Sequence, residues 1–209
     1  MVYLFDFDGT LVDSMPFWSG IHIKTLRDAG IPVPDGFVET ITPLGNYHAA
    51  RYTLSLGVDL PFDRYLDHVN STLFTAYTTH IGLKAYVKDT LERLKARHIS
   101  LNVLTASPHL YVDPCLQRAG IYELFDNVWT IDDFGLTKAQ TEIYQAAAER
   151  LRADIADCVM VDDNLTAIST AKAAGMQTVA VYDSSSASSA HILQETADRY
   201  IHDFREFPV

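Results

Sequence analysis

Short apolar runs alternate with amphipathic stretches along much of the chain. Residues 2–5, together with Phe7, form a β-prone run that ends at Gly9 and Thr10, and this pattern predicts a short buried strand. Four later runs predict strands over residues 100–104, 128–131, 158–161 and 179–181.

Amphipathic segments with apolar residues at helical spacing separate these strands. They predict helices around residues 87–94, up to Gly120, over residues 143–151 and over residues 165–174. Gly175 stands where a C-cap glycine belongs, whereas Pro114 should interrupt the helix before Gly120 unless that helix begins at the proline. Repeated strand–helix units predict an α/β fold, a Rossmann-like, doubly wound parallel sheet with helices on both faces.

Residues 14–82 have a different hydrophobic pattern, which is mostly helical. Apolar residues from Phe17 to Leu26 predict a helix, and helical patches follow around residues 46–56 and 62–80 without strand alternation. We therefore expect an α/β core of residues 1–13 and 83–209 and an inserted helical-bundle cap domain of residues 14–82.

Charge and composition argue against several classes of protein, among them nucleic-acid-binding and membrane proteins. The 209 residues include 16 Lys and Arg against 27 Asp and Glu, a net charge of −11 that argues against binding to nucleic acid or to an anionic membrane. The N-terminus carries no basic leader, and no run approaches the roughly 20 apolar residues of a membrane span. Cys115 and Cys158 form no CxxC pattern, so we expect reduced thiols in a cytoplasmic protein.

Two carboxylates follow the first predicted strand. Asp6 and Asp8 lie two positions apart, so their side chains point to the same side. Neighbouring carboxylates repel each other unless a cation holds them. A solvated pair at a strand end is the alternative, but Gly9 and Thr10 leave backbone N–H groups able to approach a ligand and favour a binding site.

A second acidic pair, Asp162 and Asp163, closes the strand of residues 158–161. As an alternative, either residue could simply cap the following helix. Oxygen ligands from Asp6 and Asp163 together suit Mg²⁺, which uses few carboxylates and keeps several water molecules. Because ligands bind at the carboxyl ends of parallel strands, we expect Mg²⁺ as a cofactor at this edge.

A hydroxyl and an ammonium group complete the candidate site. Thr105 ends a predicted strand, and Ala106 and Ser107 precede a helix whose N-terminus would offer N–H donors to an anion. Lys138 precedes another predicted helix. A plain N-cap and a solvated loop lysine are the alternative interpretations. With the carboxylates, these groups are what phosphoryl transfer requires, an oxygen nucleophile surrounded by charged clamps.

Four segments, in this order and over nearly the whole chain, resemble the motifs of haloacid dehalogenase-superfamily hydrolases of the phosphatase type with a helical cap. The first, FDFDGTLVDS, is highly specific. The segments are residues 5–14, residues 103–107, Lys138 with the residues up to Tyr144, and residues 161–163 with residues 171–176.

The resemblance implies a role for each residue. Asp6 would be the nucleophile that forms an aspartyl-phosphate, and Asp8 would protonate the leaving oxygen and later activate water. Thr105 and Lys138 would hold the phosphoryl oxygens, while the inserted domain would close over the site as a cap. The ligands of Mg²⁺ would be Asp6, the backbone carbonyl of Asp8, Asp163 and, directly or through water, Asp162.

Asp8 separates the reaction classes of this family. Halide displacement and phosphonate cleavage use no acid at this position, whereas an alkoxide that leaves a phosphate ester needs a proton. The sequence therefore predicts an Mg²⁺-dependent phosphatase that acts on a small phosphomonoester. Ala167 departs from the family pattern, which commonly has an aspartate there, and the adjacent Asp162 matches the variant that compensates.

Three other functions compete with this prediction. A sugar phosphomutase of the same superfamily is one, although Pro108 stands where such mutases often have a lysine. A non-catalytic phospho-aspartate switch of the receiver type would have its acid pair on the first strand, in the opposite order to this chain. A binding protein on the same fold would not need the full set of reactive residues.

Specificity would lie in the inserted domain. His48 and Arg51 are three positions apart and share one face of a predicted helix, so they could contact a polar or anionic part of the substrate. A solvated surface is the alternative interpretation. The oligomeric state does not follow from the sequence.

Overall fold

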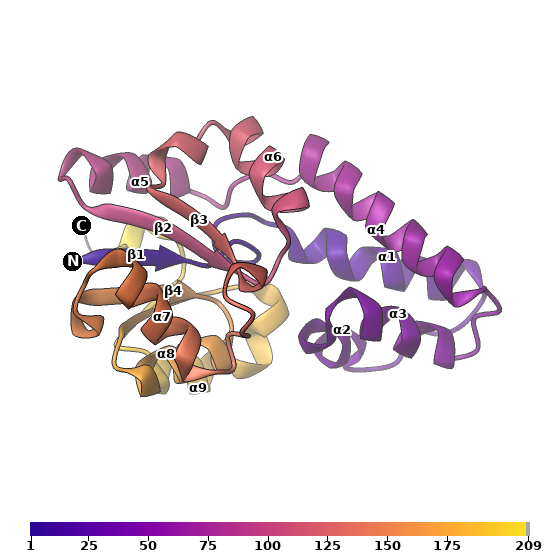
Figure 1. Ribbon diagram of the computed structural model, residues 1–209. Helices are drawn as coiled ribbons and strands as arrows, with labels where there is room; N and C mark the ends of the chain where they lie inside the picture. Colours follow the sequence, from indigo (N-terminus) through magenta and orange to yellow (C-terminus); the bar gives the residue numbers. More distant parts are fainter. Residues whose placement is uncertain (208–209) are drawn as a thin grey trace. The chain divides into compact units, whose positions relative to one another are not determined.

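The computed structural model describes residues 1–207, apart from the side chain of Pro43. Its contacts divide the chain into two compact units (Figure 1). Met1–Asp13 and the chain from Gly82 onward form the α/β unit, and Ser14–Ile81 form the helical unit.

The α/β unit is built on one sheet of parallel strands in the order β3-β2-β1-β4-β5-β6. This arrangement confirms the predicted parallel sheet. The strands are β1 (Val2–Phe5), β2 (Ser100–Thr105), β3 (Asn127–Thr130), β4 (Cys158–Asp162), β5 (Gln177–Val181) and β6 (Arg199–Ile201).

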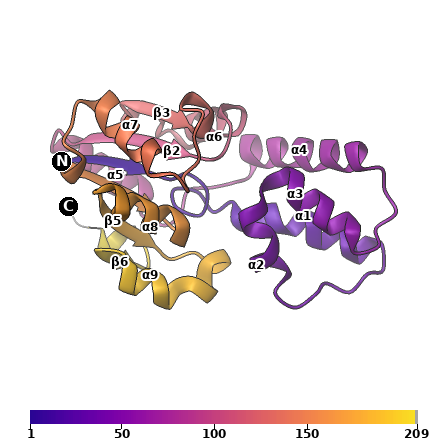
Figure 2. The same ribbon diagram turned by 60° about the horizontal axis from the view of Figure 1, so that its bottom comes forward.

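Helices cover both faces of this sheet, as the sequence predicts (Figures 1 and 2). One face carries α5 (Val87–Ala96) and α6 (His109–Ala119), and the other carries α7 (Thr141–Leu151), α8 (Leu165–Ala174) and α9 (Ala190–Thr196). Successive residues of β1 point to opposite layers. Leu4 packs into the core that includes Ile143 and Ala171, whereas the rings of Tyr3 and Phe5 stack with centroids 5.8 Å apart in the other layer.

Two features of this unit differ from the sequence-based expectation. Strand β6 has only three residues and begins with the exposed Arg199, so no apolar run marks it. Helix α6 begins at His109 and runs through Pro114, although the proline was expected to interrupt this helix unless the helix began there. A proline inside a helix cannot donate to the carbonyl four residues earlier. That carbonyl belongs to Leu110, a residue that is 60% exposed.

The register of the central strands brings the candidate residues to one edge. Phe5 of β1 pairs with Val103 of β2 on one side and with Val161 of β4 on the other. The amide of Asp6 then donates to the carbonyl of Val161 at 2.8 Å. The residues that follow β1, β2 and β4 therefore emerge side by side at the carboxyl ends of the strands, where ligands of such sheets bind.

The helical unit consists of α1 (Met15–Asp28), α2 (Phe37–Ile41), α3 (Gly45–Ser55) and α4 (Phe62–Thr79). The core of this unit contains a polar side chain, the fully buried His22. Its Nδ1 lies 2.9 Å from the hydroxyl of Tyr65 and 3.1 Å from that of Thr53. Burial disfavours the charged imidazole and lowers the pKa of His22 to about 4. The unit is therefore built around a neutral histidine.

Short 3₁₀ turns connect several of these elements. They are Thr42–Leu44, Tyr122–Leu124, Ile131–Asp133, Ile155–Asp157, Ser184–Ser189 and Phe204–Glu206. Across residues 1–207, no helix is both long enough and apolar enough to cross a membrane.

Candidate active site

Lys138 joins the two strand ends that carry the acidic residues. Its ammonium group donates to Oδ1 of Asp6 at 2.5 Å and to Oδ2 of Asp162 at 2.8 Å. The side chain of Lys138 is only 13% exposed. Burial opposes its charge, but the two carboxylates outweigh burial and raise the pKa of Lys138 above its ordinary value. The lysine is therefore a fixed cation, 132 positions from Asp6 in the sequence.

Asp163 lies against the turn that follows β1. Thr10, which is fully buried, donates its hydroxyl to Oδ1 of Asp163 at 3.3 Å. Gly9 has a φ of +71°, and a Cβ atom at this position would lie 2.6 Å from Oδ2 of Asp163. The turn thus requires glycine twice, for its backbone conformation and for its close approach to the carboxylate.

Asp6, Asp162 and Asp163 form a buried acidic cluster. Each offers an oxygen within 4.8 Å of the others, and each residue is no more than 8% exposed. Burial disfavours the ionised forms of Asp162 and Asp163, as do the neighbouring carboxylates. Together they raise the pKa of Asp162 to about 6 and that of Asp163 well above its usual range. Lys138 alone does not balance this charge, so the cluster fits a divalent cation with carboxylate ligands, for which Mg²⁺ is well suited.

The orientation of Asp162 is set by its neighbours. Lys138 occupies its Oδ2, and the amide of Asn164 donates to its Oδ1 at 2.8 Å. Asn164 in turn caps α8, because its side chain accepts from the amides of Thr166 and Ala167. The helix cap at this strand end is thus Asn164, whereas Asp162 faces the cluster.

Asp8 bonds to the residue after the second strand end. The hydroxyl of Ser107 donates to Oδ2 of Asp8 in a short hydrogen bond. Ser107 is itself held by its amide, which donates to the hydroxyl of Thr105 at 3.1 Å. Thr105 is buried at the end of β2, and Ala106 is exposed between the two. The Asp8 side chain lies outside the acidic cluster and interacts with the loop after β2.

Tyr144, which no sequence argument singled out, braces the loop of Lys138. Its hydroxyl lies 3.0 Å from the carbonyl of Lys138 and 3.1 Å from that of Ala167. The side chain is fully buried, and burial raises the pKa of Tyr144. At Ala167 the chain therefore contributes a backbone acceptor to this contact. The signal available in the sequence was its position, six residues after Lys138.

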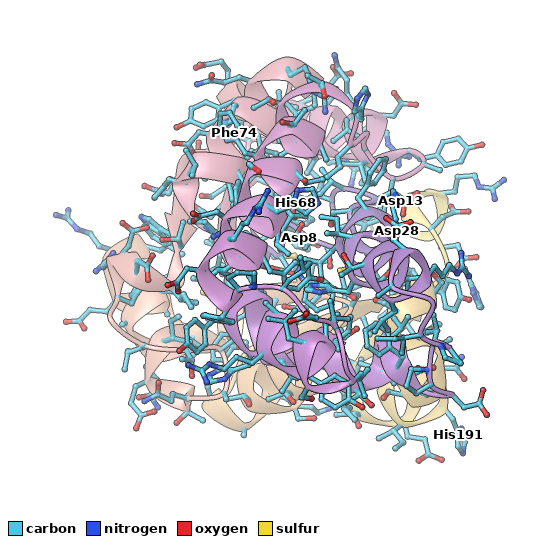
Figure 3. All side chains as sticks on the ribbon, turned by 90° about the vertical axis from the view of Figure 1, so that its right-hand side faces the viewer. Asp8, Asp13, Asp28, His68, Phe74 and His191 are labelled. Atoms are coloured by element: carbon cyan, nitrogen blue, oxygen red, sulfur yellow. The ribbon has the colours of Figure 1, made fainter. Side chains whose placement is uncertain are left out.

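The two candidates of the helical unit lie on α3 and are both exposed. Arg51 donates to the hydroxyl of Tyr47 at 2.8 Å, and its guanidinium lies over the rings of Tyr47 and Phe62. The ring of His48 meets that of Tyr47 edge-on. These stacking contacts hold Arg51 on a local aromatic cluster. Figure 3 labels three other residues of this unit, Asp28, His68 and Phe74.

Known proteins share this fold and these motifs. The family of haloacid dehalogenase-like hydrolases matches residues 3–181. A phosphoglycolate phosphatase of Colwellia psychrerythraea is 29% identical over 188 residues, which cover 85% of this chain and 82% of that protein. The pyrophosphatase PpaX of Oceanobacillus iheyensis is 28% identical over 85% of this chain and 81% of its own.

Solved structures agree at the level of the fold. A family IA, variant 3 hydrolase from Entamoeba histolytica superposes with a TM-score of 0.81 at 22% identity, over all of this chain and 95% of the other. Because the family match spans most of the sequence, the chain belongs to the haloacid dehalogenase-like hydrolases.

Proposed function

We propose that this protein is an Mg²⁺-dependent phosphatase that hydrolyses a small phosphomonoester through an aspartyl-phosphate on Asp6. The observation that carries the proposal is the buried contact of Lys138 with both Asp6 and Asp162, beside Asp163. Such a site would surround a single carboxylate nucleophile with one fixed cation and a cluster able to hold a second. The relatives named phosphatase and pyrophosphatase support phosphate chemistry.

The reaction would proceed in two steps. In the first, a carboxylate oxygen of Asp6 attacks phosphorus, the bond from phosphorus to the ester oxygen breaks, and Asp8 in its acid form gives the leaving alkoxide a proton. In the second, Asp8 as carboxylate takes a proton from water, whose oxygen attacks the phosphorus of the aspartyl-phosphate. Inorganic phosphate leaves, and Asp6 is restored as a carboxylate.

The surrounding residues would serve these steps in distinct ways. Lys138 and Thr105 would hold the phosphoryl oxygens, and the N–H groups that follow Asp8 would contribute further donors. The bond from Ser107 holds the carboxyl group of Asp8 in place for both proton transfers. Bound at Asp6, Asp163, Asp162 and the backbone carbonyl of Asp8, Mg²⁺ would supply charge stabilisation for the phosphoryl group.

We assign the helical unit, inserted between Asp13 and Gly82, the role of a cap that excludes water from the reaction. On this assignment, His48 and Arg51 are candidates for contact with the polar end of the substrate. Arg51→Ala should then raise KM for some esters and not for others, with little change in kcat for the smallest substrate.

The test is phosphate release from a panel of phosphomonoesters with Mg²⁺ and then with EDTA. We expect metal-dependent release, no release by Asp6→Asn, and a ranking of esters that identifies the substrate class. If folded protein that binds Mg²⁺ releases phosphate from none of the esters, the proposed phosphatase activity is contradicted. Interconversion of two sugar phosphates that depends on a bisphosphate primer would instead identify a mutase.

A further inference from the structure

A second lysine, Lys84, is bound to the turn that carries Asp8. Its side chain is 17% exposed, and its ammonium group donates to three acceptors from distant parts of the sequence. These are the carbonyl of Gly9 at 2.6 Å, the carbonyl of Tyr182 at 2.7 Å and Oδ2 of Asp183 at 3.0 Å. An ammonium group has three N–H donors, so this set satisfies it completely.

The other partners of this ammonium group are themselves fixed. Asp183 is only 4% exposed, and its Oδ1 accepts from the amide and the hydroxyl of Ser185. Tyr182 and Asp183 directly follow β5, the strand beside β4. The ammonium of Lys84 thus connects the turn after β1 to a rigid support at the end of β5.

Lys84 also holds this turn through its backbone. Its amide donates to the carbonyl of Leu11 at 2.9 Å, and the neighbouring Leu83 forms an antiparallel bridge with Val12. Gly9 and Leu11 therefore each present a carbonyl to the same residue. Asp8, the first residue of this turn, and Asp13, which follows it, are labelled in Figure 3.

We propose that Lys84 is a positioning residue for the reaction, which holds the turn of residues 8–12 so that Asp8 and the backbone groups beside it keep their places. The inference rests on the proposed function, in which Asp8 transfers both protons. Gly9 has little freedom to move, because it packs directly against Asp163 on one side and its carbonyl is bound by Lys84. A lysine that merely formed an ion pair would need Asp183 alone.

Two substitutions distinguish a positioning role of Lys84 from a purely structural one. Lys84→Met removes all three hydrogen bonds of the ammonium, whereas Asp183→Asn removes the ion pair and leaves both carbonyl acceptors. Lys84→Met also leaves the buried Asp183 without its cation, which is destabilising. The double variant removes that unpaired charge, so it keeps the test valid if the single variant folds poorly.

Lys172→Met is the matched control. The ammonium of Lys172 likewise bridges a carbonyl, that of Thr196, and a carboxylate, that of Asp198, each at 2.8 Å. This group lies near the start of β5, because Asp198 also accepts from the amide of Thr178. The Lys172→Met variant therefore loses a hydrogen bond to a carbonyl and an ion pair to a carboxylate, as Lys84→Met does, but at the opposite end of β5.

Two readouts should be taken on each full-length variant, kcat with KM for a turned-over ester and amide hydrogen exchange in the peptide of residues 5–13. For Lys84→Met and the double variant, we expect kcat to fall about tenfold or more with KM changed less than about twofold, together with faster exchange. Asp183→Asn should have a clearly smaller effect on both, and Lys172→Met should affect neither.

Unchanged exchange and kcat in Lys84→Met would overturn the proposal. An equal loss in Asp183→Asn would do the same, because it would assign the effect to the ion pair. If the wild-type protein releases phosphate from no ester, the proposed function fails, and hydrogen exchange still shows whether Lys84 holds the turn.

Discussion

Gly9→Ala tests whether the close contact between the turn and Asp163 matters for the site. The new Cβ atom would lie 2.6 Å from Oδ2, 2.8 Å from Cγ and 3.0 Å from Oδ1 of Asp163, so the carboxylate must move. Asp163 is 7% exposed and has little room to do so. We expect Gly9→Ala to displace one of the proposed Mg²⁺ ligands.

The expected magnitude has two parts. An alanine at a φ of +71° costs about 1–2 kcal/mol, and overpacking a buried site adds roughly 1–3 kcal/mol. Gly135→Ala is the matched control, because its φ is +64° and nothing lies within 4 Å of the added Cβ. The control should lower the free energy of unfolding by the first part only.

The assay is calorimetric titration of each variant with Mg²⁺, beside urea unfolding followed through Trp129 in the α/β unit. Gly9→Ala should weaken Mg²⁺ binding by about tenfold or more, which is 1.4 kcal/mol, and Gly135→Ala should bind like the wild type. Equal Mg²⁺ affinity in Gly9→Ala and the wild type would contradict this expectation, because Asp163 would then have moved without consequence or would not bind the metal.

Two further predictions concern buried charges. Lys138→Met leaves Asp6 and Asp162 without their shared cation, and we expect kcat to fall by about 10²–10³ in a steady-state assay, whereas near-normal turnover would exclude Lys138 from the reaction. Because the pKa of His22 is depressed to about 4 in the folded protein, protonation favours the unfolded state, and the helical unit should lose up to about 3 kcal/mol of stability as the pH falls from 6.5 through about 4. Unfolding can be followed through the fluorescence of Trp18 in a protein whose Trp129 is replaced by phenylalanine. His22→Gln should abolish this pH dependence of stability, and an unchanged pH profile would contradict its assignment to His22.

Much of the fold follows from local patterns in the sequence. Buried parallel strands have short, continuous apolar sequences, and a reactive residue directly after such a sequence lies at the carboxyl edge of the sheet. The same reasoning predicts that Asp6, Asp163 and Thr105 lie at one edge. It failed for β6, which offers only three residues, and for α6, which continues through Pro114.

The finer contacts of the site could not be predicted in this way. Lys84 and Asp183 are separated by 99 positions and form no motif, so only the folded chain brings them together. The bond between Ser107 and Asp8 depends on side-chain orientation at two loops. Spacing along a chain fixes which strand end a residue occupies, but not which of several nearby groups its side chain contacts.

In the proposed mechanism Asp6 carries the phosphoryl group during turnover, and acid quenching followed by peptide mass spectrometry would detect that intermediate. The wild-type protein, mixed with Mg²⁺ and a substrate ester, should yield a peptide of the first strand heavier by one phosphoryl group on Asp6. The same peptide from Asp6→Asn should carry none. Turnover without this adduct in rapidly quenched samples, or with the phosphoryl group on another residue, would exclude Asp6 as the nucleophile.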